Sequence, residues 1–212
     1  TNVAVGRSAL RCNTTADSNT AIGNSALCLT TTGCQNTSVG YNSMDANTTG
    51  DRNVAMGRDA LGSNTTADYN VAIGSEAMEV NTTGTQNTAV GFKALQSSSD
   101  QNYNVAIGAC TMRVATGAQE NTAVGWASML DLTSGDGNVG VGYSTLANAT
   151  TGSTNTAVGQ ASSPALTTGS CNTTIGDAAG ISLTTGSNNL LLGHDAGRTG
   201  SPGGIINTGS NF

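Results

Sequence analysis

The side chains that could carry out chemistry are few, and they do not recur together. The sequence has one histidine, His194, and no carboxylate repeats beside it, so a hydrolytic triad is a poor interpretation. Four aspartates share position 16 of a 17-residue repeat: Asp17, Asp51, Asp68 and Asp136. Other residue types fill that position in the remaining copies. A calcium-binding β-roll carries an aspartate in each coil. We therefore expect no catalytic residue, no metal site and no cofactor.

The five cysteines lack the spacing of a metal site. They are Cys12, Cys28, Cys34, Cys110 and Cys171. No CxxC motif and no Cys/His pair occurs among them, so a zinc site is not indicated. Stacked coils could bring Cys12 and Cys28 within disulfide distance. Scattered thiols of a protein made in a reducing cytosol are the alternative, and the sequence leaves both open.

The aromatic residues are the best candidates for a binding surface. Four rings share position 6 of the repeat: Tyr41, Phe92, Trp126 and Tyr143. Two more, Tyr69 and Tyr103, share position 17. Both positions are otherwise variable and polar, which predicts an outer edge or a seam between chains. The rings either pack between chains or form a lateral surface that binds glycan.

These residues are carried by a repeat that is exact in length. A pentapeptide of Asn, Thr or Val, a small residue, an aliphatic residue and Gly occurs twelve times. The copies are NVAVG (2–6), NTAIG (19–23), NTSVG (36–40), NVAMG (53–57), NVAIG (70–74), NTAVG (87–91), NVAIG (104–108), NTAVG (121–125), NVGVG (138–142), NTAVG (155–159), NTTIG (172–176) and NLLLG (189–193). Every step is 17 residues, which indicates a solenoid or fibre.

Each position of the repeat, counted from its Asn, predicts a structural role. Side chains alternate along a strand, so the aliphatic position 4 and position 2 should face the interior, and the small position 3 should face outward, where another surface could approach. Gly at position 5 should end the strand. The Asn at position 1 should form a column of stacked amides or cap a turn. A large apolar residue at position 9, such as Leu61 or Met78, should fill the coil.

The interior pattern changes toward the end of the chain. Position 9 becomes Ser163, Gly180 and Gly197, while leucines appear at position 12 as Leu132, Leu166 and Leu183. We expect the interior to be refilled from the opposite wall. Residues 1–212 are predicted to be one repeat domain with regular coils over 1–154, variant coils over 155–206 and a tail over 207–212.

Composition narrows the fold and the partners. Only 9% of the residues are charged and 3% are aromatic, with 29 glycines and a net charge of −6. Such a chain lacks the basic face of a nucleic-acid site, and no apolar run reaches the roughly 18 residues of a membrane helix. The chain starts without Met, one residue before a repeat, so we expect a segment of something longer. The predicted fold is all-β, a parallel β-solenoid or β-roll of twelve 17-residue repeats.

Threonine and asparagine raise two further hypotheses. Thr pairs at positions 13 and 14, such as Thr31 and Thr32, suggest ice binding, but adjacent residues point in opposite directions and leave one exposed rank. Sequons could carry N-glycans in a eukaryotic secretory pathway. They lie at Asn13, Asn36, Asn47, Asn64, Asn81, Asn148 and Asn172.

The pentapeptides NVAIG and NTAVG, each followed by a second Gly-terminated segment, resemble the head repeats of trimeric autotransporter adhesins. They are also similar to the Asn/Thr/Gly repeats of bacteriophage tail fibres. The resemblance covers the whole chain, although the adhesin repeat is shorter than 17 residues. It implies a homotrimer of left-handed parallel β-rolls that displays a binding surface.

We expect a structural and adhesive fibre segment, not an enzyme, on a virion or a cell surface or in the extracellular space. Its partners would be copies of itself and a host glycan or receptor. The alternative is a monomeric β-solenoid that binds ice or glycan, or a subunit of an extracellular filament.

Overall fold

The computed structural model describes residues 1–198, which belong to two compact units, residues 1–104 and the residues from Val105 onward. In the described residues the regular secondary structure consists of one three-residue strand per repeat. The first unit contains β1 (Val3–Val5), β2 (Thr20–Ile22), β3 (Thr37–Val39), β4 (Val54–Met56), β5 (Val71–Ile73) and β6 (Thr88–Val90). The second contains β7 (Val105–Ile107), β8 (Thr122–Val124), β9 (Val139–Val141), β10 (Thr156–Val158), β11 (Thr173–Ile175) and β12 (Leu190–Leu192).

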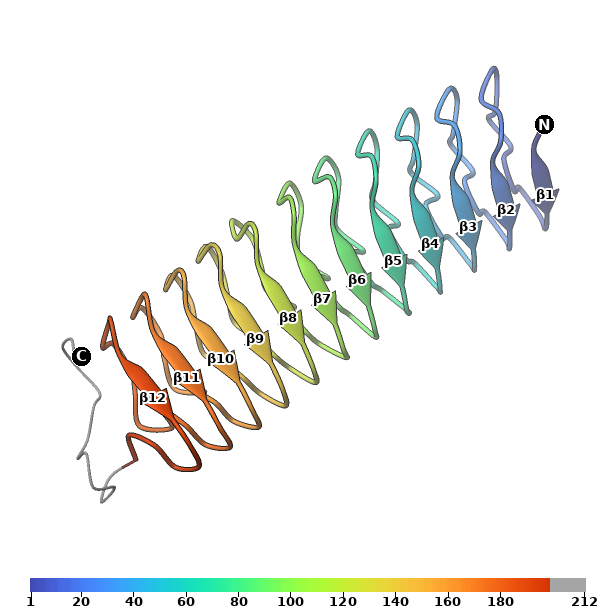
Figure 1. The fold of residues 1–212 in the computed structure, drawn as a ribbon. Coiled ribbons are helices and arrows are strands. Elements are labelled where there is room, and N and C mark those ends of the chain that lie inside the picture. The colour runs from blue at the N-terminus through green and yellow to red at the C-terminus, as the bar shows by residue number, and fades with distance from the viewer. Residues whose placement is uncertain (199–212) are drawn as a thin grey trace. The chain divides into compact units, whose positions relative to one another are not determined.

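Within each unit the strands pair in parallel, each with the strand one repeat later. Val54 lies opposite Val71 and Met56 opposite Ile73, a register of 17 residues. The second unit keeps the same register, with Thr156 opposite Thr173. In Figure 1 the arrows of neighbouring strands lie side by side and the rest of each coil returns behind them. The predicted all-β parallel solenoid with a 17-residue period is confirmed.

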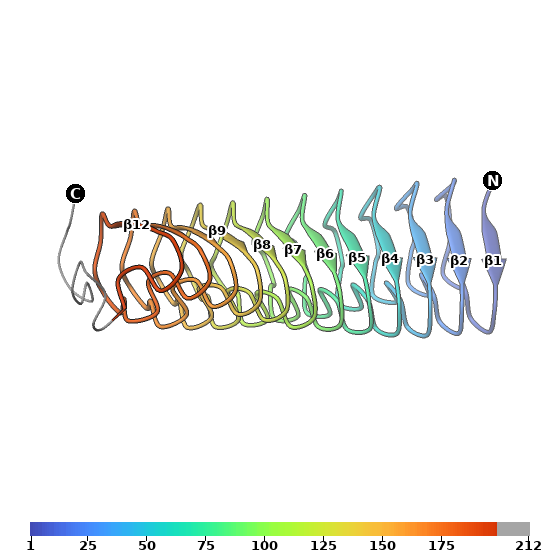
Figure 2. The ribbon, with the colours of Figure 1, turned by 60° about the horizontal axis from the view of Figure 1, so that its bottom comes forward.

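Hydrogen bonds between coils continue around the rest of each turn. The Leu27 N–H donates to the carbonyl of Ser43 at 3.1 Å, and the Thr31 N–H donates to that of Thr48 at 3.0 Å. Figure 2 shows these returning segments following one another from coil to coil within each unit. Backbone groups far from the short strands are therefore paired with the next coil, which keeps buried polar groups satisfied.

The side of each strand that faces the interior is the opposite of the predicted one. Position 3 is buried, as in Ala55 and Ala72, while positions 2 and 4 face outward, as in Val54 and Met56. The prediction that position 4 lies in a dry interior is therefore wrong, as is the prediction that the alanines face outward. The reason is the narrow space inside the coil. A Cβ on Gly140, at position 3, would lie 2.8 Å from Ser128 Oγ and 2.9 Å from Met129 Cε, so the side chains of positions 8 and 9 leave very little room there.

The prediction for position 9 is correct. Side chains here are fully buried from the second coil to the ninth: Leu27, Met44, Leu61, Met78, Leu95, Met112, Met129 and Leu146. In the variant coils Leu166 and Leu183 at position 12 are fully buried instead, which confirms the refilling from the opposite wall. The predicted tail and the last residues of the variant coils, 199–206, lie outside the described residues.

Glycine at position 5 is required for two separate structural reasons. Its backbone has φ between +112° and +142°, as at Gly57 and Gly74, a region that other residues rarely enter. A Cβ on Gly57 would also overlap the carbonyl of Gly74 in the next coil. The column therefore ends each strand, as predicted, and in addition lets neighbouring coils approach closely.

Candidate functional site

The most extensive candidate surface in each unit is the outward side of its strands, here called the outer strand face. It consists of positions 2 and 4, with Thr, Val or Leu at position 2 and an aliphatic residue at every position 4. Ile22, Met56, Ile73, Ile107 and Ile175 are between 37% and 42% exposed. No charged residue occurs in either column, so a continuous uncharged strip runs over the strands of each unit.

The Asn column at position 1 is structural. The Asn70 N–H donates to Asn53 Oδ1 at 2.9 Å, and Asn70 Nδ2 donates to the carbonyl of Gly84 at 2.8 Å. The first bond links neighbouring coils and the second closes the turn of one coil. The predicted column of stacked amides is confirmed, since Asn87 Nδ2 also donates to Asn70 Oδ1 at 3.3 Å. At Asn70 the predicted cap of a local turn is replaced by the bond to a carbonyl 14 residues further along the chain.

A second polar ladder, at position 16, was not predicted. Asp51 Oδ1 accepts the Cys34 N–H at 2.6 Å, and Asp68 Oδ1 accepts the Asp51 N–H at 2.7 Å. In the second unit Ser153 Oγ accepts the Asp136 N–H at 3.0 Å. Any short acceptor serves, and this explains why Asp, Asn and Ser replace one another here. The sequence signal for this ladder is therefore a short hydrogen-bond acceptor at position 16, not a negative charge.

Within residues 1–198, no group of three or more His, Cys, Asp or Glu side chains comes close enough together to hold a metal ion. The exposed His194 lies between two carboxylates, with Nε2 3.4 Å from Asp177 Oδ2 and Nδ1 3.5 Å from Asp195 Oδ2. Both ring nitrogens face acids, so neither is placed against a nucleophile. All five cysteines are free thiols, including Cys12 and Cys28.

Of the six aromatic candidates, the structure brings two into ring contact. Trp126 and Tyr143 stack with their centroids 4.9 Å apart and their planes 14° from parallel. Each is about half exposed. Successive coils therefore place their position-6 rings face to face.

Two candidate rings of the first unit contact cations. The Arg52 guanidinium lies 5.3 Å from the Tyr69 centroid, and its Nη1 donates to the Tyr69 hydroxyl at 2.7 Å. Lys93 Nζ lies 5.2 Å from the Phe92 centroid. Tyr41 and Tyr103 are exposed as well.

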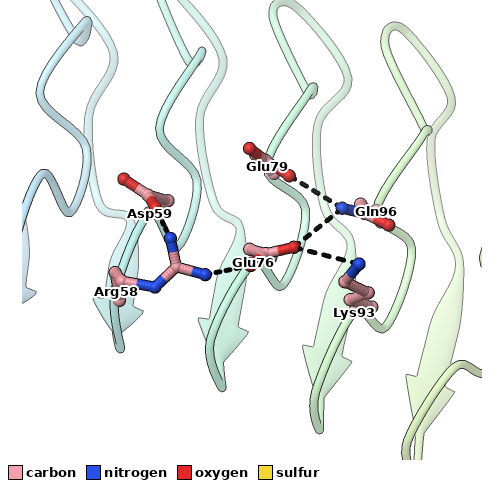
Figure 3. A network of polar contacts seen from close by, with 6 residues as sticks. All are labelled: Arg58, Asp59, Glu76, Glu79, Lys93 and Gln96. Atoms are coloured by element: carbon pink, nitrogen blue, oxygen red, sulfur yellow. Dashed lines mark hydrogen bonds and ion pairs between the residues drawn. The ribbon is translucent and has the colours of Figure 1, made fainter.

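A charged network lies on the surface of the first unit (Figure 3). Arg58 bridges Asp59 and Glu76, and Lys93 Nζ lies 3.3 Å from Glu76 Oε2. Gln96 Nε2 donates to the same oxygen at 3.1 Å. Burial opposes the charge on Glu76, but Lys93 and Arg58 outweigh it and hold the pKa of Glu76 below its ordinary value.

The network joins the fourth, fifth and sixth coils. Because its members are partly exposed, its contribution to stability is small.

The threonine columns provide one exposed rank, as predicted. Thr31 Oγ1 donates to the carbonyl of Thr48 at 3.1 Å, so position 13 is occupied by a bond to the next coil. Position 14, as in Thr49, is exposed. Among the sequons, Asn47 and Asn64 are buried, whereas Asn148 is exposed.

Comparison with known proteins identifies no relative of this chain. No family model, no curated protein and no solved structure matches the chain. Over the part of the chain that the structure describes, no helix has the length and apolar character needed to cross a membrane.

Proposed function

We propose that this chain is a structural and adhesive segment of a fibre, which assembles as a homotrimer through the outer strand face. The observation that carries the proposal is the uncharged strip, which is aliphatic at every position 4 and Thr, Val or Leu at position 2. Soluble monomers rarely expose contiguous apolar patches larger than a few hundred Å². A strip that recurs in every coil is better explained as a surface covered in the assembled protein.

A second copy of the chain is the partner whose surface matches the strip. Its coils have the same spacing, because parallel strands pair about 4.8 Å apart in every copy. Each coil can therefore meet an equivalent coil along the whole strip, which an unrelated surface could not do. The number three comes from the resemblance to the heads of trimeric autotransporter adhesins.

Attachment to a host or surface is the role that such a fibre serves. The exposed rings at positions 6 and 17 are the surfaces available to a glycan or receptor. The segment would stand on a virion, as in a tail fibre, or on a cell surface. Ice binding has less support, because one exposed threonine rank does not make a two-dimensional array.

Light scattering after size exclusion tests the assembly. At micromolar concentration the wild-type chain should have three times the mass of one chain. Ile73→Asp should lower this mass to that of a monomer while the β-sheet circular dichroism is retained, because a carboxylate cannot be buried unpaired between apolar faces. The control is Ser75→Asp, two residues away and outside the strip, which should leave the mass unchanged.

A monomeric wild-type chain with intact β structure would contradict the assembly. Loss of folding in Ile73→Asp alone would contradict the outward orientation of position 4.

A further inference from the structure

We propose that the open face of the Trp126 ring binds one pyranose ring of a surface polysaccharide, in a notch above Ala109. This inference rests on the attachment role proposed above and names the ligand and the residues. It concerns the second unit alone.

The rings of Trp126 and Tyr143 define which ring face is open. Three successive coils present Ala109, Trp126 and Tyr143 at position 6, and the Ala127 N–H donates to the Ala109 carbonyl at 3.0 Å while the Ser144 N–H donates to the Trp126 carbonyl at 2.9 Å. Tyr143 stacks on one face of Trp126 at 4.9 Å. The opposite face of the indole therefore looks toward the coil of Ala109.

Ala109 leaves that face uncovered. Its side chain is a single methyl group, whereas Tyr143 and Gln160, in the two coils beyond Trp126, carry long side chains. We call the space left by the missing side chain the notch; because coils lie about 4.8 Å apart, it should be about one coil high. A pyranose ring lying flat against the indole occupies a similar thickness, so one sugar residue can take the place that a third ring would have in the stack.

The chemistry of the notch favours a sugar over a charged ligand. Ala109 forms its floor, and the residues at position 7 of the same coil and of the Trp126 coil are Cys110 and Ala127. None of these carries a charge, so a phosphate would find no cation at the floor. The apolar C–H face of a pyranose fits the negative face of an indole ring, while the sugar hydroxyls on its edge stay in water.

The other exposed rings do not provide this combination. Tyr69 holds the guanidinium of Arg52, and Phe92 lies beside the ammonium of Lys93. Cations on these rings compete with a sugar for the ring face. Tyr41 and Tyr103 are exposed, but within residues 1–198 the stacked pair is Trp126 and Tyr143. The inference therefore narrows the six sequence candidates to Trp126, supported from behind by Tyr143.

Retention of the full chain on insoluble pyranose polymers tests the proposal. The probes are a β-1,4-glucan, a β-1,4-linked N-acetylglucosamine polymer and an α-1,4-glucan, with the bound fraction measured by depletion. The wild-type chain should be retained on at least one polymer, and Trp126→Ala should lower retention on it at least tenfold. Tyr41→Ala removes an exposed ring elsewhere in the same column and should change retention less than twofold.

Ala109→Tyr is the decisive variant. Position 6 already accepts Tyr41 and Tyr143, so the fold should tolerate it, and the new ring should extend the stack and fill the notch. Retention should then fall as far as in Trp126→Ala, although the protein has gained an aromatic ring. Retention that is unchanged or increased in Ala109→Tyr would overturn the proposal, and so would a wild-type chain that no polymer retains.

The mass of every variant is measured by light scattering alongside retention, which separates this inference from the proposed assembly. A trimer that no polymer retains contradicts the sugar site only. A monomer that binds through Trp126 contradicts the assembly only.

Discussion

The two units fill the same interior corner, position 12, in opposite ways. In the first unit it holds a polar ladder, in which Asn64 Nδ2 donates to Asn47 Oδ1 at 2.7 Å and to the carbonyl of Ala67 at 3.2 Å. In the second unit it holds apolar side chains, among them the fully buried Leu166 and Leu183. A Cβ on Gly169 would lie 2.7 Å from Leu166 Cδ1, so the leucine packs directly on the turn.

The two solutions have different consequences for the rest of the coil. Where position 12 is Asn, position 9 carries the large side chain, as in Leu61 and Met78. Where position 12 is leucine in the variant coils, position 9 is Ser163 or Gly180, and Thr174 and Leu191 at position 3 occupy space that alanine leaves open elsewhere. In the variant coils positions 3 and 12 therefore supply the interior side chains that position 9 lacks, as close packing requires.

The polar solution also depends on its neighbours. Asn81 Nδ2 donates to Asn64 Oδ1 at 3.4 Å, but the next residue of the column is Ser98, whose hydroxyl donates to Gln101 Oε1 at 2.6 Å. Asn81 Oδ1 is consequently buried without a hydrogen-bond partner. An amide ladder satisfies its members only where it continues, whereas an apolar column can end at any coil.

The largest expected effect comes from placing the interior of one region in the other. Gly180→Leu should destabilise the chain by about 3 kcal/mol, because a Cβ there would lie 3.1 Å from Thr174 Cγ2 and against Ser163 Oγ. Denaturant unfolding followed by circular dichroism measures the loss. Leu61→Met, at the same position of a regular coil, is the control and should cost less than about 1.5 kcal/mol.

Adding Thr174→Ala to Gly180→Leu should restore part of the lost stability. A double variant no more stable than the single one would argue against volume compensation between positions 3 and 9.

An intermediate effect should separate the inside of the polar ladder from its end. Asn64→Ala removes a donor from Asn47 Oδ1 and an acceptor from Asn81 Nδ2, and should cost about 2 kcal/mol. Asn81→Ala also loses two bonds donated by its Nδ2, but it removes a buried oxygen that has no partner, which offsets part of the loss, and should cost about 1 kcal/mol. The same unfolding measurement compares the two, and equal losses would mean that the ladder is not cooperative.

The smallest effect concerns the charged network around Glu76 in the first unit. The pKa of Glu76 is lower in the folded chain, so its contribution to stability is present above the pKa of the unfolded chain and is lost as pH falls through the folded one. Wild type and Glu76→Gln should therefore differ slightly at neutral pH and converge in acid. A thermal melting series across pH measures this, and a difference that grows in acid would contradict it.

Much of the fold was predictable because the twelve repeats show which residue type occupies each position of the coil. Because the repeats contain no insertion or deletion, the sequence predicts the 17-residue register. It also predicts the turn at Gly57 and its equivalents and the buried Leu and Met of position 9. The alternation of a strand, however, says only that Ala72 and Ile73 face opposite ways. Choosing the more hydrophobic residue for the interior gave the wrong face.

The candidate surfaces were predictable only as columns. Position 6 could be recognised as exposed and partly aromatic, but the sequence did not distinguish the stacked Trp126 and Tyr143 from Tyr69 under its arginine. Those differences depend on side-chain directions that neighbouring coils impose. The backbone also adopts φ near +50° at Leu61 and Met78, a left-handed conformation that their residue types disfavour.

What the sequence alone determined is the one-dimensional order: twelve units, their period, and the type of residue in each column. Backbone hydrogen bonds between one coil and the next, about one period apart in the sequence, hold that order as stacked coils. What only the tertiary structure decided is which column faces inward, because this depends on the volume inside a closed coil. In the regular coils the leucine or methionine of position 9 occupies most of that volume, so only the small residues of the strand fit inward.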